Sequence, residues 1–257
     1  AKPLIDGVET LERTRVKFDV PARLLEDLES GQVDLALCPV IDYFRARVPL
    51  RIVPAGGIGC QGETLTVRLY SRVPIDRVDR VFADSDSHTS VALLQVLFHQ
   101  IHRRQVAVVP YHAREQVAQH RLVEPPATML LIGDKVVTDS PRAVEYPYQL
   151  DLGQAWHDLT GLPFLFAVWM APEGAALGDL PDQLAAQRQR NAARIDEIVD
   201  RYAQAHGWPR DLARQYLGRI LRYEVEKPQL QAMERFAAMA QELGLIEATR
   251  PLRLWRE

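Results

Sequence analysis

The sequence has few cysteines and no long hydrophobic run. Cys38 and Cys60 are the only two cysteines among 257 residues, and no group of Cys and His side chains has the spacing of metal ligands. The two thiols are therefore expected to be reduced and buried, and neither a disulfide framework nor a metal site is predicted. No apolar stretch approaches the roughly 20 residues of a membrane-spanning helix, so a membrane protein is not expected either.

An excess of basic residues is also missing. The sequence has 31 Lys and Arg against 34 Asp and Glu, a formal net charge of -3. A nucleic-acid-binding surface needs a basic excess to contact phosphates, so nucleic acid is not an expected partner. A local basic pocket for a small anion is compatible with this balance. The 47% hydrophobic and 25% charged residues are ordinary for a globular protein with one large domain or two modest ones.

Short β-type runs alternate with helical patterns in the first two thirds of the chain. This alternation is typical of an α/β protein with mainly parallel strands. The predicted strands are 15–20, 34–39, 50–54, 64–70, 80–83, 106–109, 129–132 and 164–170. Helices are predicted at 21–30, where Pro21 opens the first turn, and at 89–102.

From about Leu180 the pattern changes to long amphipathic helices with little β signal. We therefore expect two lobes. The first is formed by residues 1–80 and by the helical part 174–257, which returns to it, and the second by residues 81–173. A ligand is expected in the cleft between the lobes, with the chain crossing near Arg80 and Met170.

The segment from Asp84 to Val91 is rich in hydroxyl groups and leads from a predicted strand into a helix. Backbone N–H groups in the first turn of a helix, together with the helix dipole, favour an anion, and Ser and Thr hydroxyls add donors. The alternative is a plain helix cap, for which the same residue types are preferred. His88 in this segment is a candidate for contacting the anion or for acting as a base.

Three further segments end or precede predicted strands. Residues 56–63 are rich in glycine, but a strand follows them and not a helix, so they are not a dinucleotide-binding fingerprint. They form either a plain loop or a loop that touches a ligand. Cys38 lies at a strand end, where ligands gather in α/β sheets, and is either a nucleophile without an identifiable partner or a small buried residue. For Asp134 a structural hydrogen bond is expected.

Several stretches together resemble the chorismate dehydratase family and follow the family's order along the whole chain. They are AKPLIDGVE, GQVDLALCPVIDYF, IGCQGETLTVRLYSRVP, DSDSHTSVALLQVL, MLLIGDKVV, YQLDLGQAWHDLTGLPFLFAVW and the C-terminal ELGLI region. The most specific is TGLPFLFAVW preceded by Leu-Gly-x-x-Trp. The resemblance implies an α/β, two-lobed, periplasmic-binding-protein-like type II fold with an interdomain cleft. It also implies a cytoplasmic hydro-lyase without metal or organic cofactor.

By the same resemblance, the expected reaction removes water from chorismate to give 3-[(1-carboxyvinyl)oxy]benzoate in the futalosine route to menaquinone. Carried over by position, the carboxylate-binding residues are Ser87, Thr89 and Ser90. The expected walls of the cleft are Cys38, Pro39, Val40, Cys60 and Gly62. No residue of the sequence stands out as the general base, a role that a substrate carboxylate can fill.

The resemblance also places a catalytic asparagine outside the sequence. Family members begin with a strand that ends in Tyr/Phe-Leu-Asn, just before the residues matched by Ala1-Lys2-Pro3-Leu4. At a rise of roughly 3.3 Å per residue, a core-spanning strand with its end loop predicts about ten further residues before Ala1.

Two other functions are compatible with the same sequence. A solute-binding receptor shares the expected fold and needs no catalysis. The related dihydroxynaphthoate synthase, which acts on cyclic dehypoxanthine futalosine, shares it too. Its pattern has a Thr-Thr pair where this chain has Thr89-Ser90, and the TSVALL and GLPFLFAVW stretches resemble the dehydratase more closely.

Overall fold

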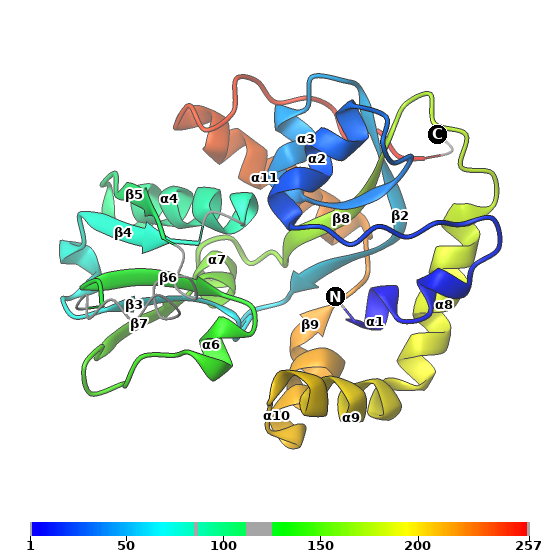
Figure 1. Ribbon diagram of the computed structural model, residues 1–257. Helices are drawn as coiled ribbons and strands as arrows, with labels where there is room; N and C mark the ends of the chain where they lie inside the picture. The colour runs from blue at the N-terminus through cyan, green and yellow to red at the C-terminus, as the bar shows by residue number, and fades with distance from the viewer. Residues whose placement is uncertain (1, 85–86, 112–124, 256–257) are drawn as a thin grey trace.

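The computed structural model describes residues 2–84, 87–111 and 125–255, and its strands form two β-sheets. Sheet A has the strand order β1-β8-β2-β9, with β1 (Ala36–Pro39), β2 (Leu50–Cys60), β8 (Phe164–Pro172) and β9 (Leu221–Arg222). Sheet B has the order β5-β4-β6-β3-β7, with β3 (Val67–Ser71), β4 (Arg80–Ala83), β5 (Ala107–Pro110), β6 (Thr128–Ile132) and β7 (Tyr148–Asp151). Figure 1 shows the two sheets side by side, each in its own lobe.

Helices surround both sheets, and α4 (His88–His102) lies where the lobes meet. It contacts α3 (Val40–Arg45), α7 (Leu152–Thr160) and α11 (Lys227–Glu242). The other helical elements are α1 (Lys2–Ile5), η1 (Val8–Thr10), α2 (Pro21–Glu29), η2 (Ile75–Arg77), α6 (Lys135–Thr138), α8 (Leu180–Ala193), α9 (Ile195–His206), α10 (Arg210–Gln215) and η3 (Tyr216–Ile220). None of the helices in the described ranges is long and apolar enough to cross a membrane.

Antiparallel pairs outnumber parallel pairs, so the expectation of mainly parallel strands is wrong. All three ladders of sheet A are antiparallel, and in sheet B β3 is antiparallel to both of its neighbours, whereas β4 pairs in parallel with β5 and β6. The reason is the path of the chain between the lobes. β2 leads toward sheet B and β8 returns beside it, which places Leu50 opposite Pro172 and Cys60 opposite Phe164.

The sheets also divide the chain at other points than 80 and 173. The expected second lobe leaves out β3 and includes β8, yet β3 lies in sheet B between β6 and β7, and β8 lies in sheet A between β1 and β2. The crossings follow β2 and β7 instead of lying near Arg80 and Met170. A strand pattern shows that a segment is extended, but its partners are distant in sequence, so the pattern does not reveal the sheet to which the strand belongs.

Most predicted elements are confirmed. β4 has the predicted bounds, and α2 and α4 match the predicted helices to within one residue. The predicted strand at 15–20 is wrong, because these residues are extended but pair with no strand of the described chain. Phe18 in this segment is 69% exposed, so its alternating pattern is not matched by burial. Strands β7 and β9 were not predicted.

The glycine-rich segment contributes to a strand and is not simply a loop. Residues 56–60 form the second half of β2, beyond an irregularity in its pairing with β8 between Val53 and Gly57. A Cβ atom on Gly59 would lie 2.6 Å from the carbonyl oxygen of Phe164, and one on Gly57 would lie 2.8 Å from that of Ala167. The glycines therefore permit the close approach of the two strands that join the lobes.

One hydrophobic core runs through both lobes. Its buried members come from both sheets and from α3, α4 and α11. At its centre the rings of Trp156, Phe164 and Phe236 meet edge to face, with centroids 5.2 to 6.2 Å apart. This continuous core holds the start of α4 firmly between the lobes.

Candidate functional site

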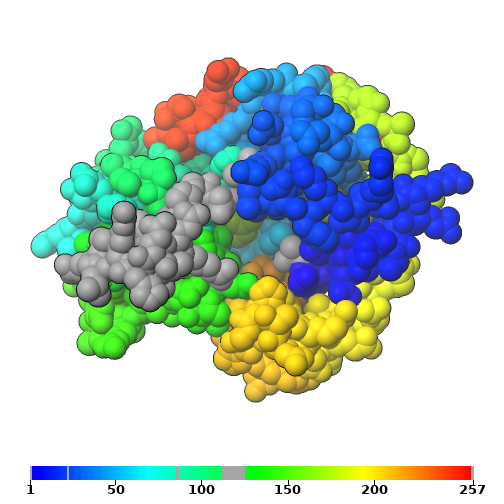
Figure 2. Space-filling model, in the orientation of Figure 1, coloured from blue at the N-terminus to red at the C-terminus, as the bar shows by residue number. Residues whose placement is uncertain are grey.

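The first turns of α3 and α4 meet between the lobes. α3 begins directly after β1, with Pro39 before its first residue, and α4 begins at His88. The hydroxyl oxygen of Thr89 accepts a hydrogen bond of 3.2 Å from the backbone N–H of Ile41. This hydrogen bond connects the first turns of the two helices. Figure 2 shows that the surface is hollowed between the lobe of sheet B and the rest of the molecule.

The hydroxyl groups at the start of α4 are arranged as donors. Ser87 occupies the cap position, but its side chain makes no capping hydrogen bond; it donates instead to the hydroxyl of Ser90 at 2.8 Å. Thr89 and Ser90 are both 1% exposed. Thr89 accepts from Ile41 and Ser90 accepts from Ser87, and no other described residue accepts the hydroxyl proton of either side chain. The plain helix cap, the alternative interpretation of this segment, is not formed by Ser87.

A carboxylate and an imidazole face each other beside these hydroxyls. Nδ1 of His88 lies 2.9 Å and 3.1 Å from the two carboxylate oxygens of Asp42. The side chain of Asp42 is 1% exposed and that of His88 is 31% exposed. Asp42 was not predicted as a site residue, because it comes from α3 and sequence spacing does not bring it to α4.

The expected wall residues of the cleft divide into two groups. Pro39 and Val40 adjoin Ile41 and hence Thr89, whereas Cys60 ends β2 opposite Phe164 of β8 and lies, like Gly62, beside α7. A Cβ atom on Gly153 would lie 2.6 Å from Sγ of Cys60 and 2.7 Å from the carbonyl oxygen of Gly62. All five expected wall residues, which are Cys38, Pro39, Val40, Cys60 and Gly62, are buried.

Neither cysteine has the electrostatic surroundings of a nucleophile. Burial raises the pKa of the Cys38 thiol far above its ordinary value, and the nearby charge of Asp42 raises it further. Burial, followed by the charge of Asp151, raises the pKa of Cys60 to about 12. A nucleophilic cysteine needs a lowered pKa, so both side chains are buried thiols, the second of the two interpretations left open for Cys38.

Asp134 makes the structural hydrogen bonds expected of it, and they join the two lobes. It follows β6, and its carboxylate accepts a hydrogen bond from the hydroxyl of Tyr202 and contacts Nδ1 of His206 at 2.7 Å, both on α9. The rings of Tyr202 and His206 stack with centroids 4.3 Å apart. Burial, and then the Asp134 carboxylate, raise the pKa of Tyr202 far above its ordinary value.

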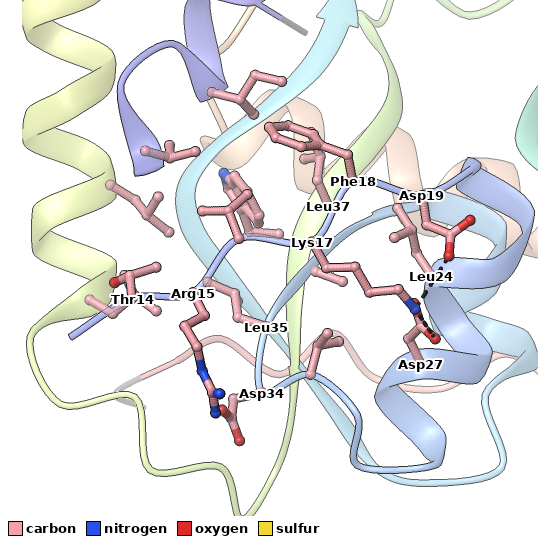
Figure 3. Close-up of a pocket in the computed structure, with 18 of the residues that line it drawn as sticks. Thr14, Arg15, Lys17, Phe18, Asp19, Leu24, Asp27, Asp34, Leu35 and Leu37 are labelled. Atoms are coloured by element: carbon pink, nitrogen blue, oxygen red, sulfur yellow. Dashed lines mark hydrogen bonds and ion pairs between the residues drawn. The ribbon is translucent and has the colours of Figure 1, made fainter. Parts of the chain in front are cut away.

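A pocket of about 500 Å³ lies elsewhere, beside β1 in the lobe of sheet A. It is lined mainly by residues 13–19 and 32–37, with further side chains from α2 and α8, and none of the expected site residues lines it. Figure 3 shows Leu35 and Leu37 at its wall and Lys17 paired with Asp27, at 2.7 Å. Within the described ranges, no three His, Cys, Asp or Glu side chains come together as a metal site.

Comparisons with solved structures show the fold. A protein of Archaeoglobus fulgidus matches with a TM-score of 0.68 at 17% identity, over 95% of this chain and 94% of that one. The periplasmic aliphatic sulphonate binding protein of Escherichia coli matches with a TM-score of 0.65 at 15% identity, over 99% and 93% of the two chains. The predicted two-lobed, periplasmic-binding-protein-like fold is therefore confirmed.

Comparisons of sequence show the family. The chorismate dehydratase of Thermus thermophilus is 29% identical over 242 residues, which are 88% of this chain and 87% of that protein. A family model described as menaquinone biosynthesis matches residues 1–242. The chain therefore belongs to the menaquinone biosynthesis family.

Proposed function

We propose that this protein is a cytoplasmic hydro-lyase that converts chorismate to 3-[(1-carboxyvinyl)oxy]benzoate and water. The observation that carries the proposal is the similarity to the Thermus thermophilus chorismate dehydratase, which extends over 88% of this chain. Membership of the menaquinone biosynthesis family supports it. The likeness to sulphonate binding proteins supports only the fold, because fold does not determine function.

The chemistry of the reaction requires orientation more than a strong nucleophile. In chorismate the C3–H is vinylogous to the ring carboxylate, and the C4 hydroxyl is the leaving group. Loss of both completes an aromatic ring. The protein therefore has to hold two carboxylates in a fixed position, provide for proton transfer and keep bulk water from the reacting atoms.

The start of α4 supplies the donors that a carboxylate needs. In our proposal, the hydroxyls of Thr89 and Ser90 donate to one substrate carboxylate, together with N–H groups of the first helical turn. The hydrogen bond from Ile41 to Thr89 and the one from Ser87 to Ser90 fix the directions of these hydroxyls before the substrate binds. Such preorganised donors stabilise developing charge without reorganisation during the reaction. In the same proposal, Pro39 and Val40 form the adjoining wall.

The test is turnover of the full chain with two substrates offered separately, chorismate and cyclic dehypoxanthine futalosine. Mass spectrometry should detect the dehydrated aromatic product from chorismate and leave the second substrate unchanged. A variant Thr89→Val, Ser90→Ala should bind chorismate more weakly, while the matched variant Thr138→Val on α6 should behave like the parent. Turnover of the second substrate alone would overturn the proposal in favour of the related synthase. Tight binding of chorismate without any turnover would overturn it in favour of a receptor.

A further inference from the structure

The pocket of about 500 Å³ beside β1 has no role in the function proposed above. We infer that it is the binding site of a further β-strand, which lies parallel to β1 and is supplied by the residues that immediately precede Ala1 in the full-length polypeptide. This strand would complete sheet A whatever reaction the protein catalyses.

β1 has an open edge, and its residues line the pocket. Within the described part of the chain, β1 is the outermost strand of sheet A and its one ladder is with β8. Residues 32–37, which include the first half of β1, line the pocket. An edge strand presents a row of unpaired backbone N–H and C=O groups, which is a template for another strand. The pocket therefore adjoins backbone that is available for pairing.

A second extended segment also lines the pocket. Residues 13–19 contribute to its wall, and residues 15–20 are extended without a partner strand among the described residues. Figure 3 shows side chains of both segments around the same space. α2 joins this segment to β1, and a crossover helix of this kind makes the two extended segments run in the same direction. A strand between them therefore has a parallel neighbour on each side.

The apolar side chains of this segment are uncovered. Val16, Phe18 and Val20 are 37%, 69% and 41% exposed. Three of the eight exposed large hydrophobic side chains of the described residues thus fall within five positions. Adjacent strands of a sheet cover one another's side chains on each face. A neighbouring strand would therefore bury apolar surface that is otherwise in contact with water.

The charges around the pocket do not favour an ionic ligand. Three basic and three acidic side chains line it, which are Arg13, Arg15, Lys17, Asp19, Asp27 and Asp34. Nζ of Lys17 lies 2.7 Å from a carboxylate oxygen of Asp27 and 3.3 Å from one of Asp19. β1 contributes the half-buried side chain of Leu37 to the wall, next to Leu35. Balanced charge, apolar side chains and open backbone suit an extended apolar segment.

The first helix of the described chain connects this strand to the protein. Ile5 of α1 and Val8 of η1 line the pocket, so the chain already lies against it within its first ten residues. Residues joined directly to α1 reach the pocket at a local concentration that a strand of another molecule does not have. β1 has four residues, and at roughly 3.3 Å per residue a strand of about five residues matches its length.

A proline scan of the full-length protein tests whether this strand exists. Proline cannot donate a ladder hydrogen bond, so Pro at each of about five successive positions before Ala1 should lower Tm by roughly 3–10 °C. Alanine at the same positions keeps the N–H group and should lower Tm less. If Pro leaves Tm unchanged at every position, the inference is wrong.

Hydrogen exchange locates the strand. Backbone amides of residues 32–37 should exchange at least about tenfold more slowly in the full-length protein than in the chain that starts at Ala1. β7, an edge strand of sheet B, is the internal control and should exchange equally in both. Equal exchange at residues 32–37 would overturn the inference and leave the pocket open to a small molecule. Protection that appears only with dimer formation would assign the pocket to a second copy and overturn it too.

Binding in trans tests the pocket itself. A synthetic peptide of the ten residues before Ala1 should bind the chain that starts at Ala1, as measured by isothermal titration calorimetry. Leu37→Asp places a charge in the wall and should weaken this binding at least about tenfold. Val144→Asp is the matched control, because Val144 is 85% exposed and does not line the pocket, and it should leave binding unchanged. If folded Leu37→Asp binds the peptide as tightly as the parent does, the strand lies elsewhere. If the chain that starts at Ala1 does not fold, the proline scan decides.

Discussion

The hydroxyl oxygen of Thr89 accepts the backbone N–H of Ile41 at 3.2 Å, and both residues are buried. This hydrogen bond joins α3, which follows a strand of sheet A, to α4, which follows a strand of sheet B. Replacing Thr89 by Val would leave the Ile41 N–H buried without its partner. We expect the free energy of unfolding to fall by about 1–3 kcal/mol, as measured by urea denaturation. Thr89→Ser should retain most of the stability; an equal loss in both variants would contradict this explanation.

Ser90 provides a prediction about binding. Ser90→Ala removes one buried donor from the proposed carboxylate site, and chorismate binding should weaken by about 1–3 kcal/mol, or roughly 5- to 150-fold. Isothermal titration calorimetry on the folded variant measures the change. Ser30→Ala, at the end of α2, is the matched control and should leave binding unchanged. An unaltered affinity in Ser90→Ala would show that the substrate carboxylate lies elsewhere.

Gly59 tests the close approach of β2 and β8. A methyl group there would lie 2.6 Å from the carbonyl oxygen of Phe164, which is backbone and moves little. Gly59→Ala should therefore lower the free energy of unfolding by about 1–3 kcal/mol. A Cβ atom on Gly174 meets no atom within 4 Å, so Gly174→Ala should stay within about 0.5 kcal/mol of the parent. Similar stabilities for the two variants would show that the strands can separate without cost.

The cysteines predict how the protein responds to thiol reagents. Burial raises the pKa of Cys60 to about 12 and raises that of Cys38 further, so at pH 8 neither side chain presents a reactive thiolate. The native protein should react with a disulfide reagent only as fast as it unfolds, whereas the protein in guanidinium should titrate both thiols at once. Rapid labelling of the folded protein would contradict this.

Tyr202 predicts a loss of stability at alkaline pH. Burial and the Asp134 carboxylate raise its pKa in the folded protein, so the folded state retains the phenol proton more strongly than the unfolded state. Its contribution is fully present below the ordinary tyrosine pKa of about 10 and is lost as the pH rises above that value. Tyr202→Phe should be less stable at pH 8 but should show a weaker decline between pH 9 and 11. An unchanged slope in urea denaturation across that range would refute the assignment.

The sequence predicted local features better than distant partners. The helix at 88–102 and the strand at 80–83 have strong local patterns, and both were predicted almost to the residue. The pairing of β2 with β8 could not be predicted from local sequence patterns, because the paired residues lie about a hundred positions apart in the chain. The same limit applies to the site. The hydroxyls that begin α4 form one contiguous run, whereas Asp42 reaches His88 only through the fold. The predicted strand at 15–20 is wrong because an alternating residue pattern does not form a strand unless a second strand pairs with it.

The position of β8 between β1 and β2 has a consequence for the order in which the protein is built. Every strand of sheet B lies between residues 67 and 151, so that sheet can assemble as soon as its segment has been synthesised. Sheet A then still lacks β8. After β2 has been synthesised, roughly one hundred further residues must be added before β8 is available, which takes about 5–20 s at ordinary translation rates. During this interval their edges are open to pairing with other chains. During synthesis, the lobe of sheet B can therefore be complete while the lobe of sheet A, whose first strands are made earlier, is not.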